Sequence, residues 1–463
     1  MKTIEVTSPY DGSVVGTVPF STMEEVQESI KRAKNLFLDK SQALTKTKRI
    51  EILEKVIRIM SSEVEALTKL CASEGGKPWV DSKVEVERAI NGVSLAIEGI
   101  ANNKGQNIPM GHTTSSEHRI AYTFKEPIGV VAAISAFNHP LNLAVHQVIP
   151  AIAVGCPVII KPAMQTPLSA YRLVEIFKEA GLPDDWAQVV VCDIPSSEFL
   201  ATSPDIDFLT FIGSNAVGWY LNSKVAQGTR VTLEHGGVAP VIVEEDAKID
   251  ALIPALGKGG FYHAGQVCVS VQRVYVHERI CDLVAEKLAA YASSLKVGNQ
   301  LDIKTQVGPL ISHKEVERVG EWVSEAIKSG AKVLCGGTQI SESCYAPTVL
   351  LNPSDSTLVS TKEVFGPVVC VYSYKEIDEA FRRANALEVS FQAAVFTQNI
   401  DSAFKAVKGL NATAVMVNDH TAFRVDWMPF GGAKTSGLGM GGIHNSMEDM
   451  QNEKLMVFKS DVL

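Results

Sequence analysis

The chain has 463 residues, enough for two or three domains that each bury a core of their own. Hydrophobic residues make up 46% of it and charged residues 21%, which is the composition of a soluble globular enzyme. The net charge of -9, without a basic stretch, argues against a nucleic-acid partner, and no run approaches the roughly 18 consecutive apolar residues of a membrane span.

The first long pattern in the chain is helical. Between 46 and 72, apolar residues recur at three- and four-residue steps, which predicts one amphipathic helix. The residues that carry this pattern are Ile50, Leu53, Ile57, Met60, Val64 and Leu67. A second helix is predicted over 80–101.

From residue 128 onward, short apolar runs alternate with helical stretches. The runs lie at 128–134, 157–160, 187–191, 207–212 and 229–233, and the helices at 141–154, 166–180 and 214–226. Buried strands that alternate with helices predict a doubly wound parallel sheet. The pattern restarts at 240 and predicts a second α/β unit. Its helices are expected near 249–260 and 278–294, and its strands at 271–276, 331–334, 366–372, 392–396 and 412–417.

Two further strands are predicted without a crossover helix. The segment 118–127, HRIAYTFKEP, alternates between apolar and polar residues, and the tail KLMVFKSDVL also has a strand pattern. Strands of this kind are candidates for a small sheet that protrudes from the α/β units.

The cysteines and histidines do not have the spacing of a metal site. The eight cysteines are scattered and the ten histidines form no HxxxH or HExxH pattern, so we expect no metal. The segment MKTIEVTSPYDGS has no apolar signal-peptide core. We therefore expect reduced thiols and a cytoplasmic location.

Cys268 lies in a segment of small residues, FYHAGQVCVSVQRV, and an acid lies in another such segment, VTLEHGG. This arrangement suits a nucleophile and a base on separate loops. A thiolate can attack a carbonyl carbon and leave a thioester, and a carboxylate can then activate the water that hydrolyses it.

Seven motifs in order resemble the aldehyde dehydrogenase superfamily over nearly the whole chain. They are EPIGVVAAISAFNHPL (126–141), KPAMQTP (161–167), FIGSNAVG (211–218), LEHGG (233–237), GQVCVS (265–270), EVFGPV (363–368) and PFGGAKTSGLG (429–439). The resemblance implies an α/β fold with two doubly wound domains and a β-strand oligomerisation arm. The implied division is an NAD(P)-binding domain at 1–107 and 128–236, a catalytic domain at 237–434, and an arm at 108–127 and 435–463.

The resemblance also implies the catalytic roles. Cys268 matches the nucleophile, Asn138 the oxyanion-stabilising amide, and Glu234 the base that hydrolyses the thioester. Lys161 matches a lysine that contacts the cofactor ribose and belongs to the same catalytic set. The implied reaction is the NAD- or NADP-dependent oxidation of an aldehyde to its acid.

The cofactor residues follow from the same motifs. The turn in FIGSNAVG presents glycines and the N-terminus of a helix to a pyrophosphate, and EVFGP matches the residues that hold the nicotinamide ribose. The expected cofactor residues are Lys161, Met164, Gly213, Ser214, Gly218, Gly237, Glu363 and Phe365.

Four departures from the family pattern matter: Met164, the short adenine-side loop DIPSS, GMGG at 439–442 and His235. Met164 replaces an acid that usually bonds the adenosine ribose, so a 2′-phosphate is repelled less and NADP becomes acceptable. His235 stands where leucine is usual, and the sequence offers no function for it.

The expected substrate contacts are polar. His139, Asn142 and His146 fall at helical spacing that faces the substrate tunnel in the family, although a polar helix face could also be solvent-exposed. Arg424 can clamp an anionic group or can pair with Asp426 or Asp419 instead.

Trp427 lies in the same loop as Arg424, and Arg119 begins the arm strand near the expected tunnel mouth. Together these residues favour a short polar or anionic aldehyde, as in the lactaldehyde, succinate-semialdehyde and phosphonoacetaldehyde branches of the family.

Two other functions are compatible with parts of the sequence. A thiol acyltransferase or esterase could use Cys268 without redox chemistry, and a structural protein could keep the fold without activity. The dinucleotide motifs oppose the first, and intact Cys268, Glu234 and Asn138 oppose the second. The expected partners are a small aldehyde and further copies of the chain, as a homodimer or homotetramer, with no nucleic acid and no membrane.

Overall fold

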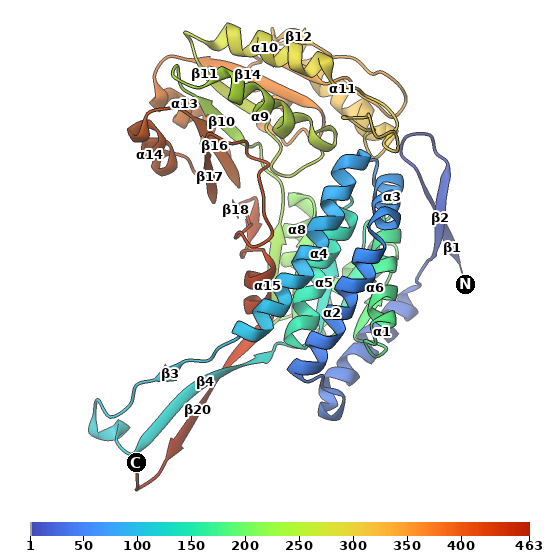
Figure 1. The fold of residues 1–463 in the computed structure, drawn as a ribbon, viewed down its shortest axis with the longest axis vertical. Coiled ribbons are helices and arrows are strands. Elements are labelled where there is room, and N and C mark those ends of the chain that lie inside the picture. The colour runs from blue at the N-terminus through green and yellow to red at the C-terminus, as the bar shows by residue number, and fades with distance from the viewer. Residues whose placement is uncertain (1) are drawn as a thin grey trace.

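The computed structural model describes residues 2–463, which form two α/β units and a narrow arm (Figure 1). The first unit is built on a six-stranded sheet with the order β19-β9-β8-β5-β6-β7. The strands are β5 (Val131–Ile134), β6 (Val158–Lys161), β7 (Ala187–Val189), β8 (Phe208–Ile212), β9 (Arg230–Glu234) and β19 (Gly437–Leu438). The strands β5 to β9 run parallel, as predicted, and β19 pairs antiparallel with β9 at the edge.

Helices bury both faces of this sheet. Alternate residues of β5 show the division, because Val131 and Ala133 pack toward one helical layer and Ala132 and Ile134 toward the other. The first layer contains α2 (Lys46–Ser62), α3 (Val64–Gly75), α4 (Trp79–Asn102), α5 (Pro140–Val154), α6 (Leu168–Glu179) and α15 (Ile443–Asp449), and the second α1 (Met23–Leu38), α7 (Ile194–Thr202) and α8 (Asn215–Asn222). Burial on both sides explains why these strands are continuous apolar runs in the sequence.

The single helix predicted over 46–72 is wrong. The chain forms α2 and α3, which meet at Glu63, a residue with φ -110° and ψ 14°. The Glu63 carboxylate accepts hydrogen bonds from Arg172 of α6 at 2.5 and 3.0 Å. The apolar pattern continues across the break because both helices bury one face within the same core, so periodicity alone does not reveal it.

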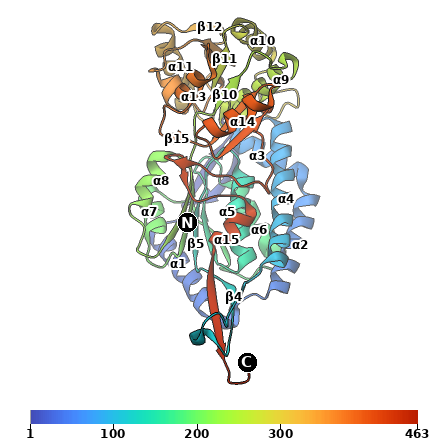
Figure 2. The same cartoon turned by 90° about the vertical axis from the view of Figure 1, so that its left-hand side faces the viewer.

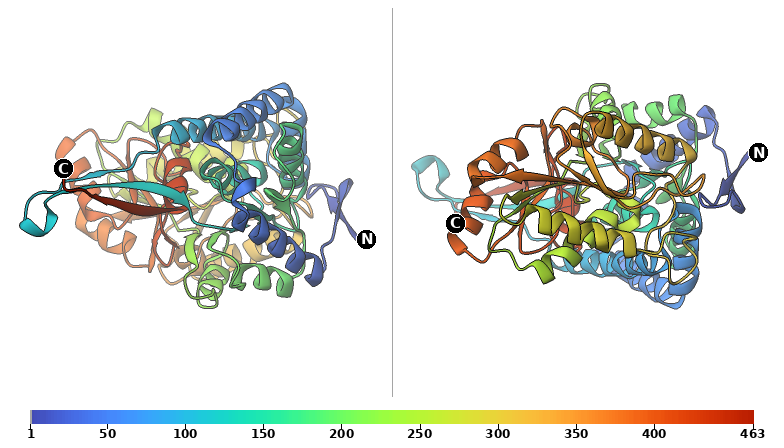
Figure 3. Two further views of the ribbon diagram at one scale, coloured as in Figure 1. Left: turned by 90° about the horizontal axis from the view of Figure 1, so that it is seen from below. Right: turned by 90° about the horizontal axis from the view of Figure 1, so that it is seen from above.

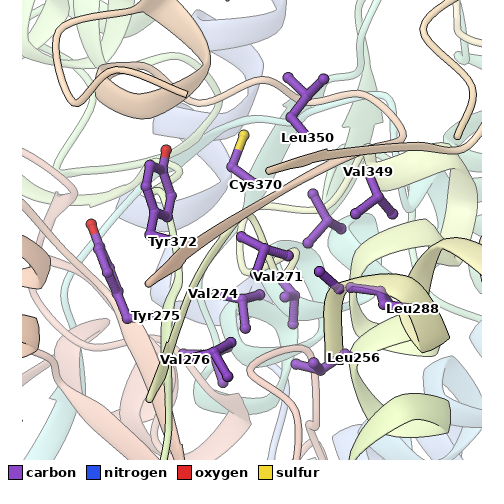
Figure 4. Packing of buried hydrophobic residues seen from close by; sticks show 14 of the residues in the cluster. Leu256, Val271, Val274, Tyr275, Val276, Leu288, Val349, Leu350, Cys370 and Tyr372 are labelled. Atoms are coloured by element: carbon purple, nitrogen blue, oxygen red, sulfur yellow. The ribbon is translucent and has the colours of Figure 1, made fainter. Parts of the chain in front are cut away.

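The second unit is built on a seven-stranded sheet with the order β12-β13-β14-β11-β10-β16-β17, in which only β12 runs antiparallel to its neighbour. The strands are β10 (Pro240–Val243), β11 (Arg273–His277), β12 (Lys332–Cys335), β13 (Thr348–Leu351), β14 (Val368–Tyr374), β16 (Gln392–Phe396) and β17 (Ala414–Val417). Its helices are α9 (Ile249–Phe261), α10 (Cys281–Ser294), α11 (His313–Lys328), α12 (Leu358–Thr361), α13 (Ile377–Ala384) and α14 (Ile400–Gly409). Figure 4 shows part of its apolar core, where Val274 of β11 and Leu256 of α9 are fully buried.

The arm is an antiparallel sheet of β3 (Asn107–Ile108), β4 (Arg119–Pro127) and β20 (Gln451–Lys459), and it projects from the first unit (Figures 1 and 3). We predicted that residues 435–463 belong to the arm, but the first part of this segment does not. Within it, β19 joins the six-stranded sheet and α15 packs on α4 and α5, so only β20 pairs with β4. No helix in the described part of the chain is long and apolar enough to cross a membrane.

The N-terminus of α5 is fixed from α4 by a buried carboxylate. Glu85 Oε1 accepts the backbone N–H groups of Leu141 and Asn142 at 3.0 and 3.1 Å. The other carboxylate oxygen pairs with Lys77 Nζ at 2.5 Å, and both side chains are fully buried. The negative charge of Glu85 also interacts favourably with the positive, N-terminal end of the α5 dipole. This contact sets where the residues at the start of α5 face.

Candidate active site

The two units enclose a cavity of about 900 Å³ between their sheets. Figure 2 shows the seven-stranded unit above the six-stranded sheet, with the carboxyl ends of the lower strands directed toward it. Polar side chains from both units line the cavity. Those from the first unit include Asn138, His139, Asn142, Lys161 and Glu234, and those from the second include Cys268, Glu363 and Arg424.

A constrained loop carries Cys268 into the cavity. Before it, His263, Ala264 and Gly265 have φ values of 49°, 54° and 72°, in the left-handed region. A Cβ at Gly265 would lie 2.0 Å from the carbonyl oxygen of Gly366, so the close approach of these two loops requires glycine there. The Cys268 carbonyl accepts the N–H of Gly237 at 3.2 Å, which ties the loop to the segment after β9.

The surroundings of Cys268 favour the neutral thiol. Burial raises its pKa well above the usual value, and the carboxylates of Glu234 and Glu363 raise it further. The Arg424 guanidinium acts in the opposite direction. The thiol therefore stays protonated at neutral pH and must lose its proton before it can attack a carbonyl carbon.

Asn138 follows β5 and Glu234 ends β9, two strands of the six-stranded sheet that are separated by β8. One amide hydrogen of Asn138 Nδ2 is donated to the Gln266 carbonyl at 2.9 Å, which fixes the side chain against the loop of Cys268. Glu234 is the last residue of β9. Burial raises the pKa of its carboxyl group above the usual value, and the charge of Arg424 opposes this shift. A thiol, an amide donor and a carboxyl group thus border one cavity, and they suit acyl chemistry.

His235, for which the sequence offered no function, supports the turn after β8. A Cβ at Gly218 would lie 1.9 Å from His235 Cε1, so Gly218 makes room for the imidazole and does not line the cavity. His235 Nδ1 donates to the Gly213 carbonyl at 3.1 Å. Gly213 and Ser214 do line the cavity.

Gly237, a predicted cofactor residue, lies outside the cavity lining. Its neighbour Gly236 does line the cavity and has no room for a side chain. A Cβ at Gly236 would lie 1.7 Å from Glu363 Oε1. Sequence reasoning missed Gly236 because the contact joins segments that are far apart in the chain.

The cavity fits a dinucleotide. It extends from Cys268 past Lys161 and Met164 to Ile194 and Tyr220. Phe365 also borders it. Glu363 Oε1 is buried without a hydrogen-bond partner, and burial raises the pKa of this carboxyl to about 8. An unpaired buried carboxyl oxygen is suited to a sugar hydroxyl, so Lys161 and Glu363 could hold the two riboses.

The predicted substrate residues divide into three positions. His139 and Asn142 line the cavity, whereas His146 lies behind it, with Nε2 at 2.8 Å from Asp426 Oδ1. Arg119 lies in the arm and donates to the carbonyls of Ser115 and Glu117. It does not border this cavity, because β4 carries it along the arm and away from both units.

Trp427 also lies outside the cavity lining and is exposed. Sequence reasoning missed Arg88, which lines the cavity from α4. No local signal marked it, because its partner Asp426 is 338 positions away in the chain.

Arg424 is not paired with either neighbouring aspartate. Asp426 is instead held by Arg88, with N–O distances of 2.7 and 3.0 Å. The Arg424 guanidinium lies 3.6 Å from the ring centroid of Phe430. Its Nε is buried without a hydrogen-bond partner. A guanidinium that lines the cavity without a carboxylate partner is suited to an anionic group.

Comparisons with known proteins agree with this geometry. Residues 1–456 match the model of the aldehyde dehydrogenase family. The 3-sulfolactaldehyde dehydrogenase of Priestia megaterium is 38% identical over 455 residues, which cover 98% of this chain and 94% of the relative. The lactaldehyde dehydrogenase of Methanocaldococcus jannaschii is 36% identical, with 98% and 97% covered.

Solved structures are equally similar. Aldehyde dehydrogenase 21 from Physcomitrella patens, in complex with the product succinate, superposes with a TM-score of 0.95 at 35% identity and covers 99% of this chain and 95% of its own. The glyceraldehyde-3-phosphate dehydrogenase GapN from Methanocaldococcus jannaschii, complexed with NADP, gives a TM-score of 0.94 at 35% identity, with 99% of both chains covered.

The electrostatics of Cys268 predict slow alkylation at neutral pH. Without cofactor, its reaction with iodoacetamide should keep accelerating above the ordinary cysteine pKa of about 8.5, because the thiolate is the nucleophile. Glu234→Gln removes one neighbouring negative charge and should move the profile to lower pH, whereas Glu317→Gln on exposed α11 should not. Mass spectrometry of the Cys268 peptide measures the rates. An alkylation rate that levels off near the ordinary cysteine pKa would contradict the raised pKa of Cys268.

Proposed function

The chain belongs to the aldehyde dehydrogenase family, and we propose that Cys268, Asn138 and Glu234 perform its chemistry. The protein is an NAD(P)-dependent aldehyde dehydrogenase, and its aldehyde is oxidised to the carboxylic acid. The observation that carries the residue assignment is the convergence of this thiol, amide and carboxyl group on one dinucleotide-sized cavity.

The proposed sequence begins at Cys268. The thiol first passes its proton to solvent, its sulfur then bonds to the aldehyde carbon, and the electron pair of the C=O bond moves to the oxygen, which becomes an oxyanion. Asn138 Nδ2 and the Cys268 N–H stabilise that charge, each by a few kcal/mol as is typical of such donors. Lys161 and Glu363 would hold NAD(P) by its riboses, where it would supply the acceptor for the hydride of this carbon; loss of that hydride leaves a thioester on Cys268. Glu234 then takes a proton from water, whose oxygen attacks the thioester carbon and releases the acid and the thiol.

Two other functions receive less support. A thiol acyltransferase or esterase needs no dinucleotide, yet Lys161, Ser214 and Glu363 line an extension of the cavity beyond the thiol. A structural protein has no use for a thiol, amide and carboxyl group around one cavity. Near-ultraviolet absorbance of reduced nicotinamide during incubation with short aldehydes separates the three, because only the dehydrogenase produces it.

We propose a short anionic or hydroxylated aldehyde as the substrate. Arg424 supports the anionic group, and His139 and Asn142 present further polar atoms to the same end of the cavity. Relatives named for sulfolactaldehyde and lactaldehyde are consistent with this class. A long alkyl aldehyde would leave the Arg424 donors and the buried Asn142 Oδ1 acceptor unpaired, at about 1–3 kcal/mol each.

The remaining features of the protein are proposed on the same basis. The projecting arm, with exposed Tyr122, Leu455 and Phe458, supports assembly into a homodimer or homotetramer. The two sheets support separate cofactor-binding and catalytic domains, with the arm as a third part. All eight cysteines are free within the described residues 2–463, which fits a reducing cytoplasm.

Glu234→Gln tests the base. The variant should still form the thioester and release one burst of reduced cofactor, and then stall, because no carboxylate activates the water. Stopped-flow absorbance measures burst and steady state separately. Cys268→Ala is the control and should lose both phases while still binding cofactor. A parallel loss of burst and steady state in Glu234→Gln would place Glu234 before hydride transfer.

Met164→Glu tests the cofactor. We expect the wild type to use NADP at least as well as NAD, because Lys161 and the uncharged Met164 line the cavity where an acid would repel a 2′-phosphate. The new carboxylate should repel the 2′-phosphate and shift the ratio of kcat/KM values toward NAD by about 1–2 kcal/mol. Met164→Leu is the uncharged control. Strict NAD use by the wild type, unchanged in Met164→Glu, would assign selectivity to another segment.

Arg424→Ala tests the substrate class. Its kcat/KM should fall by about 2 kcal/mol more for succinate semialdehyde than for butanal, because a charge-assisted hydrogen bond is lost only with the anionic aldehyde. Arg279→Ala on the exposed surface is the matched control and should affect neither substrate. An equal loss for both aldehydes would mean that Arg424 only holds its loop, and the anionic class would then be rejected.

A further inference from the structure

Four side chains form a connected network behind the cavity wall. Arg88 of α4 donates to Asp426 through Nη2 and Nε, at 2.7 and 3.0 Å. His146 Nε2 lies 2.8 Å from Asp426 Oδ1, and His146 Nδ1 lies 3.5 Å from Arg424 Nη2. The chain of contacts therefore runs from Arg88 through Asp426 and His146 to Arg424, the guanidinium at the cavity wall.

The proton positions in this network follow from its chemistry. Burial raises the pKa of Asp426, but the hydrogen bonds from His146 and Arg88 outweigh it and hold that pKa well below its usual range. The carboxylate can only accept, so His146 Nε2 carries the hydrogen. Burial first, and then the charge of Arg424, lowers the pKa of His146 to about 4, so the imidazole is neutral. Its Nδ1 lone pair therefore faces Arg424.

Arg424 is held at two places and free at a third. Its guanidinium plane rests on Phe430, which packs against Phe391 with ring centroids 4.7 Å apart. Nη2 meets the His146 lone pair, and Nε is buried without a partner. A neutral acceptor can fix the direction of a guanidinium without neutralising its charge, whereas a carboxylate in that place would compete with an anionic substrate.

We propose that His146 is a positioning residue that aims Arg424 at the anionic group of the substrate, and that Asp426 fixes the imidazole in the tautomer this requires. The inference deepens the proposed function and rests on it. It also replaces the expectation that His146 contacts the substrate, because His146 lies outside the cavity lining and both of its ring nitrogens are engaged within the protein.

Two amide substitutions separate the two ring nitrogens. His146→Gln places an amide N–H near the former Nε2 and keeps the bond to Asp426, but it removes the acceptor that faces Arg424. His146→Asn places an amide oxygen near the former Nδ1 and keeps that acceptor, but it loses the bond to Asp426. The pair thus tests the acceptor and the anchor independently.

The measurement is KM and kcat for succinate semialdehyde and for butanal, which share a four-carbon chain and differ in charge. We expect His146→Gln to raise KM for the anionic aldehyde about tenfold, with KM for butanal and both kcat values near those of the wild type. His146→Asn should raise the anionic KM by no more than about threefold, because the acceptor is retained. In the Arg424→Ala background, His146→Gln should have no further effect on either substrate.

The contrary outcomes are distinct from a failure of the proposed function. Suppose that Arg424→Ala impairs the anionic aldehyde more than butanal. If His146→Gln then raises both KM values equally, or raises neither, the inference is overturned and the substrate class stands. Additive losses in the double variant overturn it as well. If His146→Gln does not fold, a tenfold rise in the anionic KM of His146→Asn overturns it. If Arg424→Ala is itself unselective, the substrate class and this inference fall together.

Discussion

The active site depends on the carboxyl edge of the six-stranded parallel sheet. The strands β5, β6, β8 and β9 all end at this edge, and each delivers one element of the site there. These are Asn138 after β5, Lys161 at the end of β6, the Gly213 turn after β8 and Glu234 at the end of β9. Because successive strand residues face opposite sides, a one-residue slip of β6 or β9 would turn Lys161 or Glu234 toward the other face of the sheet. The pairing of buried apolar strands therefore fixes the spacing of the catalytic groups.

Burial in the active site disfavours the charged forms of its ionisable groups. Burial raises the pKa of Glu234, of Glu363 to about 8, and of the Cys268 thiol, so the resting groups tend toward their neutral forms. Arg424 is the buried cation that opposes this trend, because its charge lowers the pKa of Glu234 and of Cys268. One arginine thus acts on two functions: it offers donors to an anionic substrate and it makes the nucleophile and the base easier to ionise.

The sequence predicts the parts of this molecule that rest on local patterns. The parallel strands were predictable because both sheet faces are buried, which leaves uninterrupted apolar runs such as Val130 to Ile134. The motif residues next to the strand ends were predictable from the resemblance to the family, and not from the apolar pattern. The break at Glu63 was not, since the apolar pattern continues across it. Nor was the orientation of His146, because every residue of α5 is buried and helical spacing cannot then indicate which polar side chain reaches the cavity.

Long-range contacts explain the rest, and His235 is the clearest case. Its ring fills the space left by Gly218 and donates to the Gly213 carbonyl, so the residue after the base supports the turn that the cofactor phosphate would meet. A larger residue at 218 would displace the imidazole, and with it the backbone of Glu234. The departure from the family pattern at 235 therefore couples the cofactor turn to the base through one packed ring. This coupling joins residues of β9 and α8, and neither local segment reveals it by itself.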